Sequence, residues 1–189
     1  EALKAASGQV GGVQIQNRGT VAGNICNASP AADGIPPLVA LDSRVVVAGP
    51  TGERSVPLQD FITGYRQTVL KPGEIVTGLM IPKPDPMAQS AFLKLGARHY
   101  LVISIAMVAG ILVPTSDGRI ASVSLAVGAC SAVAKRLSEL EAALVGLPLD
   151  VDFSQFVTDP YFSDLHPIDD PRASAAYRRE AARILVVRL

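Results

Sequence analysis

The residues best suited to hold a ligand lie in one stretch, QNRGTVAGNICNASPAADGIPPLVAL, which spans residues 16–41. Gly23 permits backbone angles, or a closeness of approach, that other residues resist. Thr20 and Asn24 supply side-chain hydrogen bonds on either side of it. Successive backbone N–H groups in such a turn form an anion-binding nest. The segment therefore predicts a cradle for an anionic ligand.

Two further polar residues follow in the same stretch. Ser29 and Asp33 stand before or at an expected helix start, where free N–H groups and the helix dipole favour an oxygen-rich ligand. Asp33 is itself an acceptor, so it suits a ribityl or ribose hydroxyl better than a phosphate. The alternative is a plain loop, since glycine and asparagine clusters are usually turns. Neither a Walker loop nor the Rossmann fingerprint is present.

Few other residues are candidates for catalysis or metal binding. Cys26 and Cys130 are the only cysteines, and two isolated thiols with no histidine near them in sequence are interpreted as small core residues. His99 and His166 are too far apart for a local metal motif. No triad or pair of carboxylates indicates hydrolysis, so the sequence predicts no catalytic side chain and no metal site.

Bulk properties narrow the class further. The chain has 189 residues, 49% of them hydrophobic, and no formal net charge, which gives no electrostatic case for nucleic acid. No apolar stretch is long enough to span a bilayer. A reducing, cytoplasmic setting is the simplest interpretation of the two thiols. The sequence begins at Glu1 with a pattern typical of the interior of a helix, so we expect a fragment of a longer chain.

The pattern of elements indicates an α+β fold without βαβ alternation. In the first half we expect a helix over residues 1–7, a loop over 9–30, a helix over 33–41 capped by Asp33, and a hairpin over 43–58. A brief helical turn over 57–65 and a strand over 73–82 follow. Residues 83–87, KPDPM, carry two prolines and predict a linker. The sequence thus predicts domains over residues 1–82 and 88–189.

The second half predicts three antiparallel strands followed by helices. The strands are QSAFLKLGAR, ISIAMVAGILVP and RIASVSLAVGAC, the last two joined by the turn TSDG. An amphipathic helix follows over residues 132–146, with Leu137, Leu140 and Leu144 on one face. A connector over 147–171 leads to a final helix over about 172–187. We expect this helix to turn Tyr177, Ile184 and Leu185 inward and its arginines, Arg172, Arg178, Arg179 and Arg183, towards solvent or a subunit contact.

Three segments in register carry a family resemblance. IQNRGTVAGNICNASPAADGIPPLVAL, ITGYRQTVLKPGEIVTGLMIP and FLKLGAR together resemble the FAD-binding medium subunit of the molybdenum hydroxylases, the xanthine dehydrogenase and carbon monoxide dehydrogenase type. The resemblance runs from about Gln14 to the final helix. It is specific for the family and not for a substrate.

The resemblance implies a fold and a cofactor site. Residues 1–82 would be the second subdomain of a vanillyl-alcohol-oxidase-type FAD-binding domain, and 88–189 a small C-terminal domain with a three-stranded antiparallel sheet and helices. The implied FAD contacts are Thr20, Val21, Ala22, Gly23, Asn24, Ser29, Asp33, Ile75, Val76, Lys94 and Tyr100. Among these, Tyr100 would shield or gate the isoalloxazine. Arg98 and His99 are better interpreted as loop surface than as contacts of a nucleotide phosphate.

Lys94 has two interpretations. Without the resemblance it is an ordinary edge-strand lysine. Beside a flavin, its cation would stabilise the anionic reduced form, raise the potential and help to hold a nicotinamide nucleotide.

Two departures from the family pattern stand out. The family usually has two adjacent glycines where this chain has Ala22-Gly23, and the methyl group is tolerated only if the φ angle of Ala22 is negative. The first flavin motif, a Gly-Gly turn near the subunit's N-terminus, is absent from the sequence. We therefore expect at most half of an FAD site in this chain.

The resemblance implies one function and leaves two alternatives. In the first, a substrate is hydroxylated at molybdopterin on a large subunit, and electrons pass through two iron–sulfur clusters on a small subunit to this FAD. NAD+ accepts them in dehydrogenase types, and quinone or oxygen in others. The alternatives are a non-catalytic assembly module of such a complex and a stand-alone flavoprotein oxidoreductase.

Overall fold

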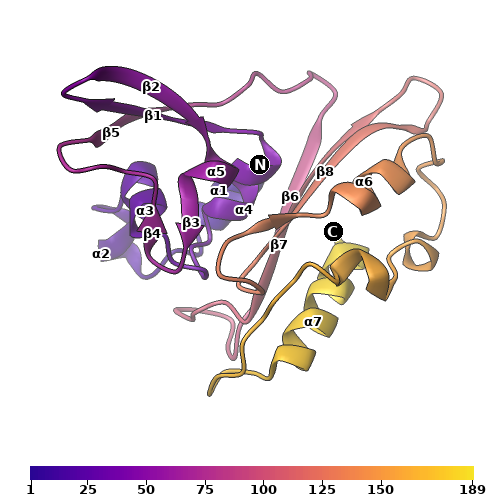
Figure 1. Cartoon of the computed structure of the whole chain (residues 1–189). Coiled ribbons are helices and arrows are strands. Elements are labelled where there is room, and N and C mark those ends of the chain that lie inside the picture. The colour runs from indigo at the N-terminus through magenta and orange to yellow at the C-terminus, as the bar shows by residue number, and fades with distance from the viewer.

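The computed structural model describes residues 1–189, and an antiparallel sheet lies at its centre (Figure 1). The three predicted strands are confirmed as β6 (Gln89–Leu95), β7 (Ala106–Pro114) and β8 (Ile120–Gly128). A two-residue strand, β9 (Lys135–Arg136), adds to the far side of β8, so that the order is β6-β7-β8-β9. The short β9 was not foreseen, because two residues carry no periodic pattern.

Both faces of this sheet are covered, which explains the continuous apolar run in β7. Met107 and Ala109 face the cluster formed with the N-terminal helices α1 (Ala2–Ser7) and α4 (Ile35–Ala40). Ala106 and Val108 face the cluster formed with α6 (Ser138–Leu144) and α7 (Ala175–Arg188). The alternation follows from the two-residue period of a strand. A sheet buried on both faces reads as an unbroken apolar segment rather than an alternating one.

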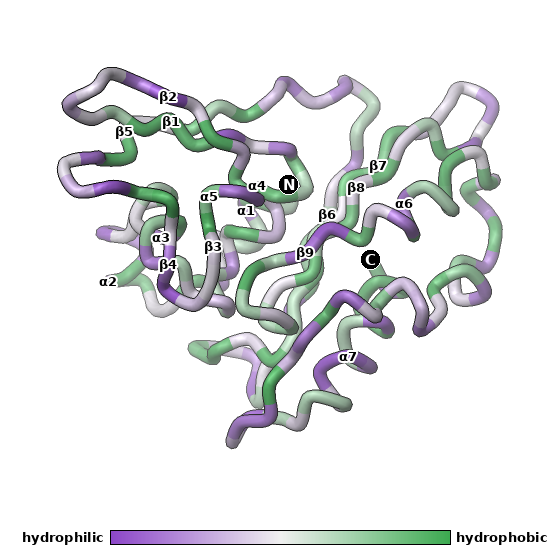
Figure 2. Tube along the Cα trace, viewed as in Figure 1, coloured by the Kyte–Doolittle hydropathy of each residue, from purple (hydrophilic) through white to green (hydrophobic).

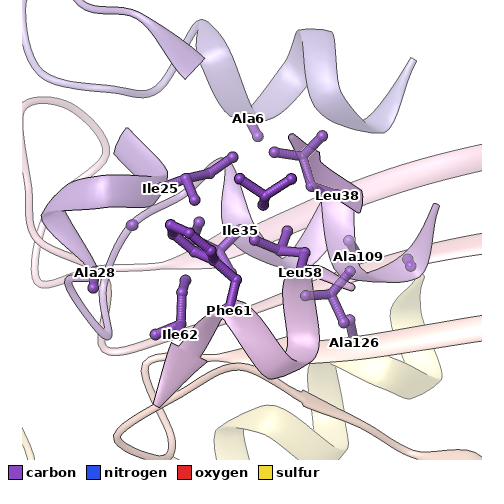
Figure 3. Packing of buried hydrophobic residues seen from close by; sticks show 14 of the residues in the cluster. Ala6, Ile25, Ala28, Ile35, Leu38, Leu58, Phe61, Ile62, Ala109 and Ala126 are labelled. Carbon is purple, nitrogen blue, oxygen red and sulfur yellow. The ribbon is translucent and has the colours of Figure 1, made fainter. Parts of the chain in front are cut away.

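The core between the sheet and the N-terminal helices is built from aliphatic side chains and two phenylalanines, Phe61 and Phe92. Figure 3 shows Ile25, Ile35, Leu38 and Phe61 converging on the small side chains of the sheet. Phe61 and Leu38 are fully buried. Small residues on the strands let α4 approach closely, which brings the residues before this helix against the edge of the sheet.

A second sheet completes the first half of the chain. It consists of β1 (Arg44–Gly49), β2 (Gly52–Pro57) and β5 (Ile75–Met80) in the order β2-β1-β5, all antiparallel. The predicted hairpin, helical turn and strand are confirmed, the turn as α5 (Leu58–Phe61). A small ladder pairs β3 (Ile62–Gly64) with β4 (Gln67–Thr68). Figure 2 shows the central strand β1 as hydrophobic and the edge strand β2 as hydrophilic.

The loop predicted over residues 9–30 is wrong. It contains α2 (Val13–Gln16) and α3 (Val21–Asn27). The Thr20 hydroxyl accepts a hydrogen bond of 2.9 Å from the Gly23 N–H and caps α3, while buried Ile25 anchors the helix to the core. The glycine and asparagines that suggested a turn are thus overridden by one cap and one buried side chain.

Two predictions about the C-terminal helices are also wrong. The helix expected over 132–146 is only α6 (Ser138–Leu144), because the preceding residues form a bend and β9; the predicted apolar face of Leu137, Leu140 and Leu144 is buried as expected. In α7, Tyr177 is 53% exposed and Ile184 is also exposed, whereas Arg178 is buried.

Arg178 turns inward because it finds partners there. Its Nη1 donates to the Ile105 carbonyl oxygen at 2.7 Å, and its Nη2 donates to Asp170 Oδ1 at the same distance. These bonds from Nη1 and Nη2 offset much of the cost of burying the guanidinium, although its Nε has no hydrogen-bond partner. The arginines of α7 are therefore not one solvated face.

The remaining connections contain little regular structure. Two 3-10 turns, η1 (Phe153–Gln155) and η2 (Asp159–Phe162), lie in the connector before α7. Residues 81–88 between β5 and β6 contain no helix or strand. No helix combines the length and the apolar composition that crossing a bilayer requires.

The second sheet provides a test of its ion pair. Arg54 on β2 holds Glu74, just before β5, through contacts of 2.8 and 3.0 Å, and these contacts lower the pKa of Glu74 from 4.5 to about 2. A lowered folded-state pKa gives stability that is complete above about pH 4.5 and is lost as the pH falls towards 2. We expect E74Q to be less stable than the wild type at pH 7, and the difference to narrow below pH 4.5.

Urea unfolding at several pH values measures this difference. E53Q is the control, because the Glu53 side chain on the same hairpin is exposed and forms no ion pair. A gap between E74Q and the wild type that stays constant from pH 7 to pH 3 would contradict the assignment.

Candidate functional site

The most distinctive polar arrangement in the molecule is a buried group of three side chains. Lys94 Nζ donates to Asp33 Oδ2 at 2.7 Å, and Ser104 Oγ donates to Asp33 Oδ1 at 2.7 Å. Asp33 precedes α4, Lys94 lies on β6, and Ser104 closes the loop before β7. Two predicted site residues, 61 positions apart in sequence, therefore meet.

The ion pair is shielded from water. The side chains of Lys94 and Asp33 are only 5% and 7% exposed. Taking two charges out of water is costly, and only close contact plus further hydrogen bonds offset that cost. Ser104 supplies such a bond to the carboxylate, and the Gln9 carbonyl oxygen lies 3.5 Å from the ammonium nitrogen of Lys94. The interpretation of Lys94 as an ordinary edge-strand lysine is wrong for this reason.

Asp33 does not cap the following helix. The residue at the N-cap of α4 is Gly34, and no side chain caps it. The carboxylate turns instead to Lys94 and Ser104, whose combined bonds are stronger than one cap contact. Asp33 lines a cavity, described next, and its expected role as the cap of the helix is wrong.

Two cavities adjoin this buried group. The larger, about 650 Å³, is bounded by Gln9, by β6 including Lys94, and by the loop carrying Arg98 and Tyr100. The smaller, about 280 Å³, is lined by Asn24 and Asp33 and by the end of the same loop. Leu101 and Val102 belong to both walls. Lys94, Asp33, Asn24 and Tyr100 thus surround one pair of neighbouring cavities.

The segment Thr20–Asn24 forms the first turn of a helix rather than a loop nest. Ala22 has no positive φ, so its methyl group is accommodated. The Asn24 Oδ1 atom is buried without a hydrogen-bond partner, and Asn24 lines the smaller cavity. A buried acceptor left unpaired is costly, and at the wall of a cavity it is available to a donor from outside the chain. The ribityl and ribose hydroxyls of FAD are donors of that kind, so the residues present fit this cofactor.

Hydrogen bonds within the loop between β6 and β7 hold its shape. Arg98 donates from Nε and Nη2 to the Leu101 carbonyl oxygen at 3.2 and 2.5 Å, and Leu101 takes a left-handed φ of 51°. At the base of the loop the Ile105 N–H donates to the Leu95 carbonyl oxygen at 2.7 Å. Exposed Tyr100 stands at the tip of this fixed loop. Arg98 is on the surface, as expected, and also holds the loop's shape.

Some predicted contacts do not line the two cavities. Ile75 and Val76 lie on β5, where Ile75 is 65% exposed and Val76 packs on the core. Ser29 accepts a bond of 3.3 Å from the Ala31 N–H and stays local. Thr20 caps α3, and Val21, Ala22 and Gly23 begin it. The next residue of the same turn, Asn24, lines the smaller cavity.

Sequence reasoning missed Ser104 and Gln9. Ser104 is the single polar residue in the apolar run LVISIAMV, and a polar residue inside such a run is a signal for a buried hydrogen bond. Gln9 contributes only a backbone carbonyl, for which no side-chain signal exists.

The thiols and carboxylates form no further centre. Cys130 is buried, and burial raises the pKa of its thiol to about 12, which leaves it a small apolar residue as expected. Cys26 is exposed, so its interpretation as a core residue is wrong. Across residues 1–189, no three metal-ligating side chains gather.

Comparison with known proteins agrees with this geometry. Residues 1–84 match the family described as the FAD binding domain in molybdopterin dehydrogenase, and residues 91–189 match the CO dehydrogenase flavoprotein C-terminal domain. The chain therefore belongs to the FAD-binding, or medium, subunits of the molybdenum hydroxylases, and FAD is the cofactor of its domain.

Particular relatives bear different names. The chain is 32% identical to the nicotinate dehydrogenase FAD-subunit of Eubacterium barkeri, over 96% of this chain and 62% of that protein. It is 30% identical to the glyceraldehyde dehydrogenase medium chain of Sulfolobus acidocaldarius, over 95% and 63%. It is also 30% identical to a putative xanthine dehydrogenase FAD-binding subunit of Escherichia coli, over 94% and 61%.

A solved structure shows the same fold. The carbon monoxide dehydrogenase of Hydrogenophaga pseudoflava superposes with a TM-score of 0.88 at 27% identity, over 95% of this chain and 62% of the matched chain. The expected combination of second FAD subdomain and C-terminal domain is confirmed. The chain spans somewhat less than two thirds of the length of these relatives.

The buried ion pair predicts a large stability effect. K94M leaves the Asp33 carboxylate charged and without its cation, which costs about 3–5 kcal/mol in a buried pair. We expect the double variant K94M/D33N to recover much of this loss, because no charge is then stranded.

Urea unfolding of both variants at neutral pH checks this expectation. R183M is the matched control, since its partner Glu180 is 50% exposed and such pairs contribute about 0–1 kcal/mol. If K94M costs no more than R183M, Lys94 and Asp33 do not form the described pair in solution.

Proposed function

We propose that this chain is the FAD-carrying part of a molybdenum hydroxylase. Its partners would be a large molybdopterin subunit and a small subunit with two [2Fe–2S] clusters. When bound, FAD supplies the transfer of electrons from the iron–sulfur clusters to NAD+ or another acceptor. The observation that carries the proposal is the buried Asp33–Lys94 pair beside two cavities, in a chain of this family.

The residues of this chain would bind and orient the cofactor. We assign the smaller cavity to its hydroxyl groups, because unpaired Asn24 Oδ1 and the Asp33 carboxylate are acceptors there. Contacts from the start of α3 and from neighbouring segments complete the proposed set: Thr20, Val21, Ala22, Gly23, Ser29, Ile75 and Val76. The assignment of these seven rests on the family resemblance, since they do not line the cavities.

Lys94 and Tyr100 would act at the larger cavity. The Lys94 ammonium has one close partner, so part of its donor capacity remains for the anionic reduced form of the cofactor. A fixed cation at that place favours reduction, because the low dielectric strengthens its field. Tyr100, exposed on the loop between β6 and β7, would cover the isoalloxazine and limit access of water.

The acceptor is also part of the proposal. Lys94 lines the larger cavity, where its ammonium would help to hold a nicotinamide nucleotide. We keep a xanthine dehydrogenase-like enzyme as the first candidate, supported by the Escherichia coli relative. Relatives named for nicotinate and glyceraldehyde are equally similar, which agrees with a substrate pocket on another subunit.

Two further points belong to the same proposal. The domains would cover residues 1–82 and 88–189 with a linker at 83–87, supported by the absence of helix or strand over 81–88. The location would be cytoplasmic, supported by two cysteines that form no disulfide.

The visible absorption spectrum of the purified chain, with mass spectrometry of released cofactor, tests the function. Flavin bands with FAD near one per chain, either as purified or after addition of FAD, would support binding of the cofactor by the residues of this chain. A chain that stays colourless with added FAD would contradict FAD binding by this chain alone and favour either half of an FAD site or the assembly module. Flavin in a chain that captures no molybdopterin or iron–sulfur subunit would favour the stand-alone flavoprotein.

A matched pair of threonine variants tests the place of binding. T20A removes the cap of α3, which costs about 1 kcal/mol, and should weaken FAD binding about tenfold, measured by quenching of flavin fluorescence. T115A is the control, because Thr115 Oγ1 likewise accepts a backbone N–H bond of 2.9 Å, from Arg119, in the distant β7–β8 turn. Equal affinities for T20A and T115A would place the cofactor away from α3.

A further inference from the structure

One side chain of the buried group has no assigned role. Ser104 is completely buried at the end of the loop between β6 and β7, and its hydroxyl donates to Asp33 Oδ1 at 2.7 Å. Ser104 does not line either of the two cavities. Its only described polar partner is the carboxylate that also holds Lys94.

The backbone next to Ser104 is fixed from two sides. The Ile105 N–H donates to the Leu95 carbonyl oxygen on β6, and the Ile105 carbonyl oxygen accepts from Arg178 Nη1, both at 2.7 Å. Arg178 is itself buried on α7. The Ser104 hydroxyl is therefore an anchored donor, and the carboxylate must adjust to it rather than the reverse.

This anchoring decides how Lys94 is held. Oδ1 of Asp33 accepts from Ser104, while the ammonium of Lys94 bonds to Oδ2. The second contact of Lys94, to the Gln9 carbonyl oxygen at 3.5 Å, is long. The ammonium thus keeps N–H groups for the larger cavity, which it lines.

We propose that Ser104 is a positioning residue of the cofactor cavity: its hydroxyl fixes the Asp33 carboxylate so that Lys94 presents its cation to the bound cofactor. This role rests on the proposed FAD function. A hydroxyl suits it because it donates a hydrogen bond without adding charge, so the Asp33–Lys94 pair remains neutral as a unit.

Loss of the hydroxyl has a directional consequence. In S104A, Oδ1 is released and both carboxylate oxygens turn to the ammonium, which draws the cation away from the cavity. Reduced FAD carries more negative charge than oxidised FAD, so it loses more of its stabilisation. A purely structural defect would weaken both redox states alike.

The decisive measurement compares affinity for the two redox states. We expect S104A to bind reduced FAD about tenfold more weakly, relative to oxidised FAD, than the wild type does, which lowers the midpoint potential by about 30 mV for a two-electron couple. S131A is the matched control, because Ser131 is buried outside both cavities and its hydroxyl bonds only to backbone, the Cys130 carbonyl oxygen and the His166 N–H. An unchanged potential in S104A would overturn the positioning role.

A second measurement needs no cofactor. In the ¹⁵N-lysine-labelled chain, the ammonium signal of Lys94, identified by its loss in K94M, should shift or broaden in S104A and stay in place in S131A. A signal that does not move in S104A overturns the inference whatever FAD does. If the Lys94 signal shifts in S104A as expected but the wild-type chain does not take up FAD, the proposed function is overturned. Ser104 then positions Lys94 without serving a cofactor. If S104A does not fold, S104C keeps the volume and a weaker donor and should give a smaller shift in the same direction.

Discussion

The buried bond between the Lys94 ammonium and the Asp33 carboxylate is the contact on which the rest of the site depends. It joins residues from the two matched family regions, at 1–84 and 91–189. In water such a pair would contribute little, but here both charges are shielded, so neither can leave without stranding the other. The pair therefore fixes the edge of the central sheet against the residues that precede α4, and the two cavities open beside that edge.

The packing of the central sheet holds this contact in place. Its strands pack on α1 and α4 with one face and on α6 and α7 with the other (Figure 1). Close packing on both sides leaves little freedom to slide, because interiors respond to even small changes in volume. Lys94 on β6 and the segment before β7 are thus held by elements from both ends of the chain. The sheet is the closely packed part of the molecule, and the loop with Tyr100 lies exposed at its edge.

Much of the fold follows from local sequence, whereas the site follows from it only in part. The β-branched run of β1 and the turn after it determine a hairpin locally, and Leu140 and Leu144 mark the buried face of α6. The glycine and asparagine of α3 suggested a loop, because the effect of buried Ile25 is tertiary. The bonds of Arg178 to Ile105 and of Ser104 to Asp33 span more than seventy positions. No local pattern encodes such partners. Asp33 was indicated by its place before an expected helix, the role of Lys94 was indicated by the resemblance, and Ser104 was found only in three dimensions.

Arg178 has a consequence for how this family can be recombined. It reaches from α7 to the backbone beside Ser104, so the last helix is coupled to a site whose carboxylate comes from the first third of the chain. A chimera that joins the N-terminal region of one relative to the C-terminal region of another must bring a compatible carboxylate, ammonium, hydroxyl and guanidinium together. Crossover points at the proline-rich segment 83–87 are convenient for the backbone, yet they separate Asp33 from its two partners, Lys94 and Ser104, and from Arg178. Successful domain shuffling in this lineage would therefore require these four positions to be inherited as a set.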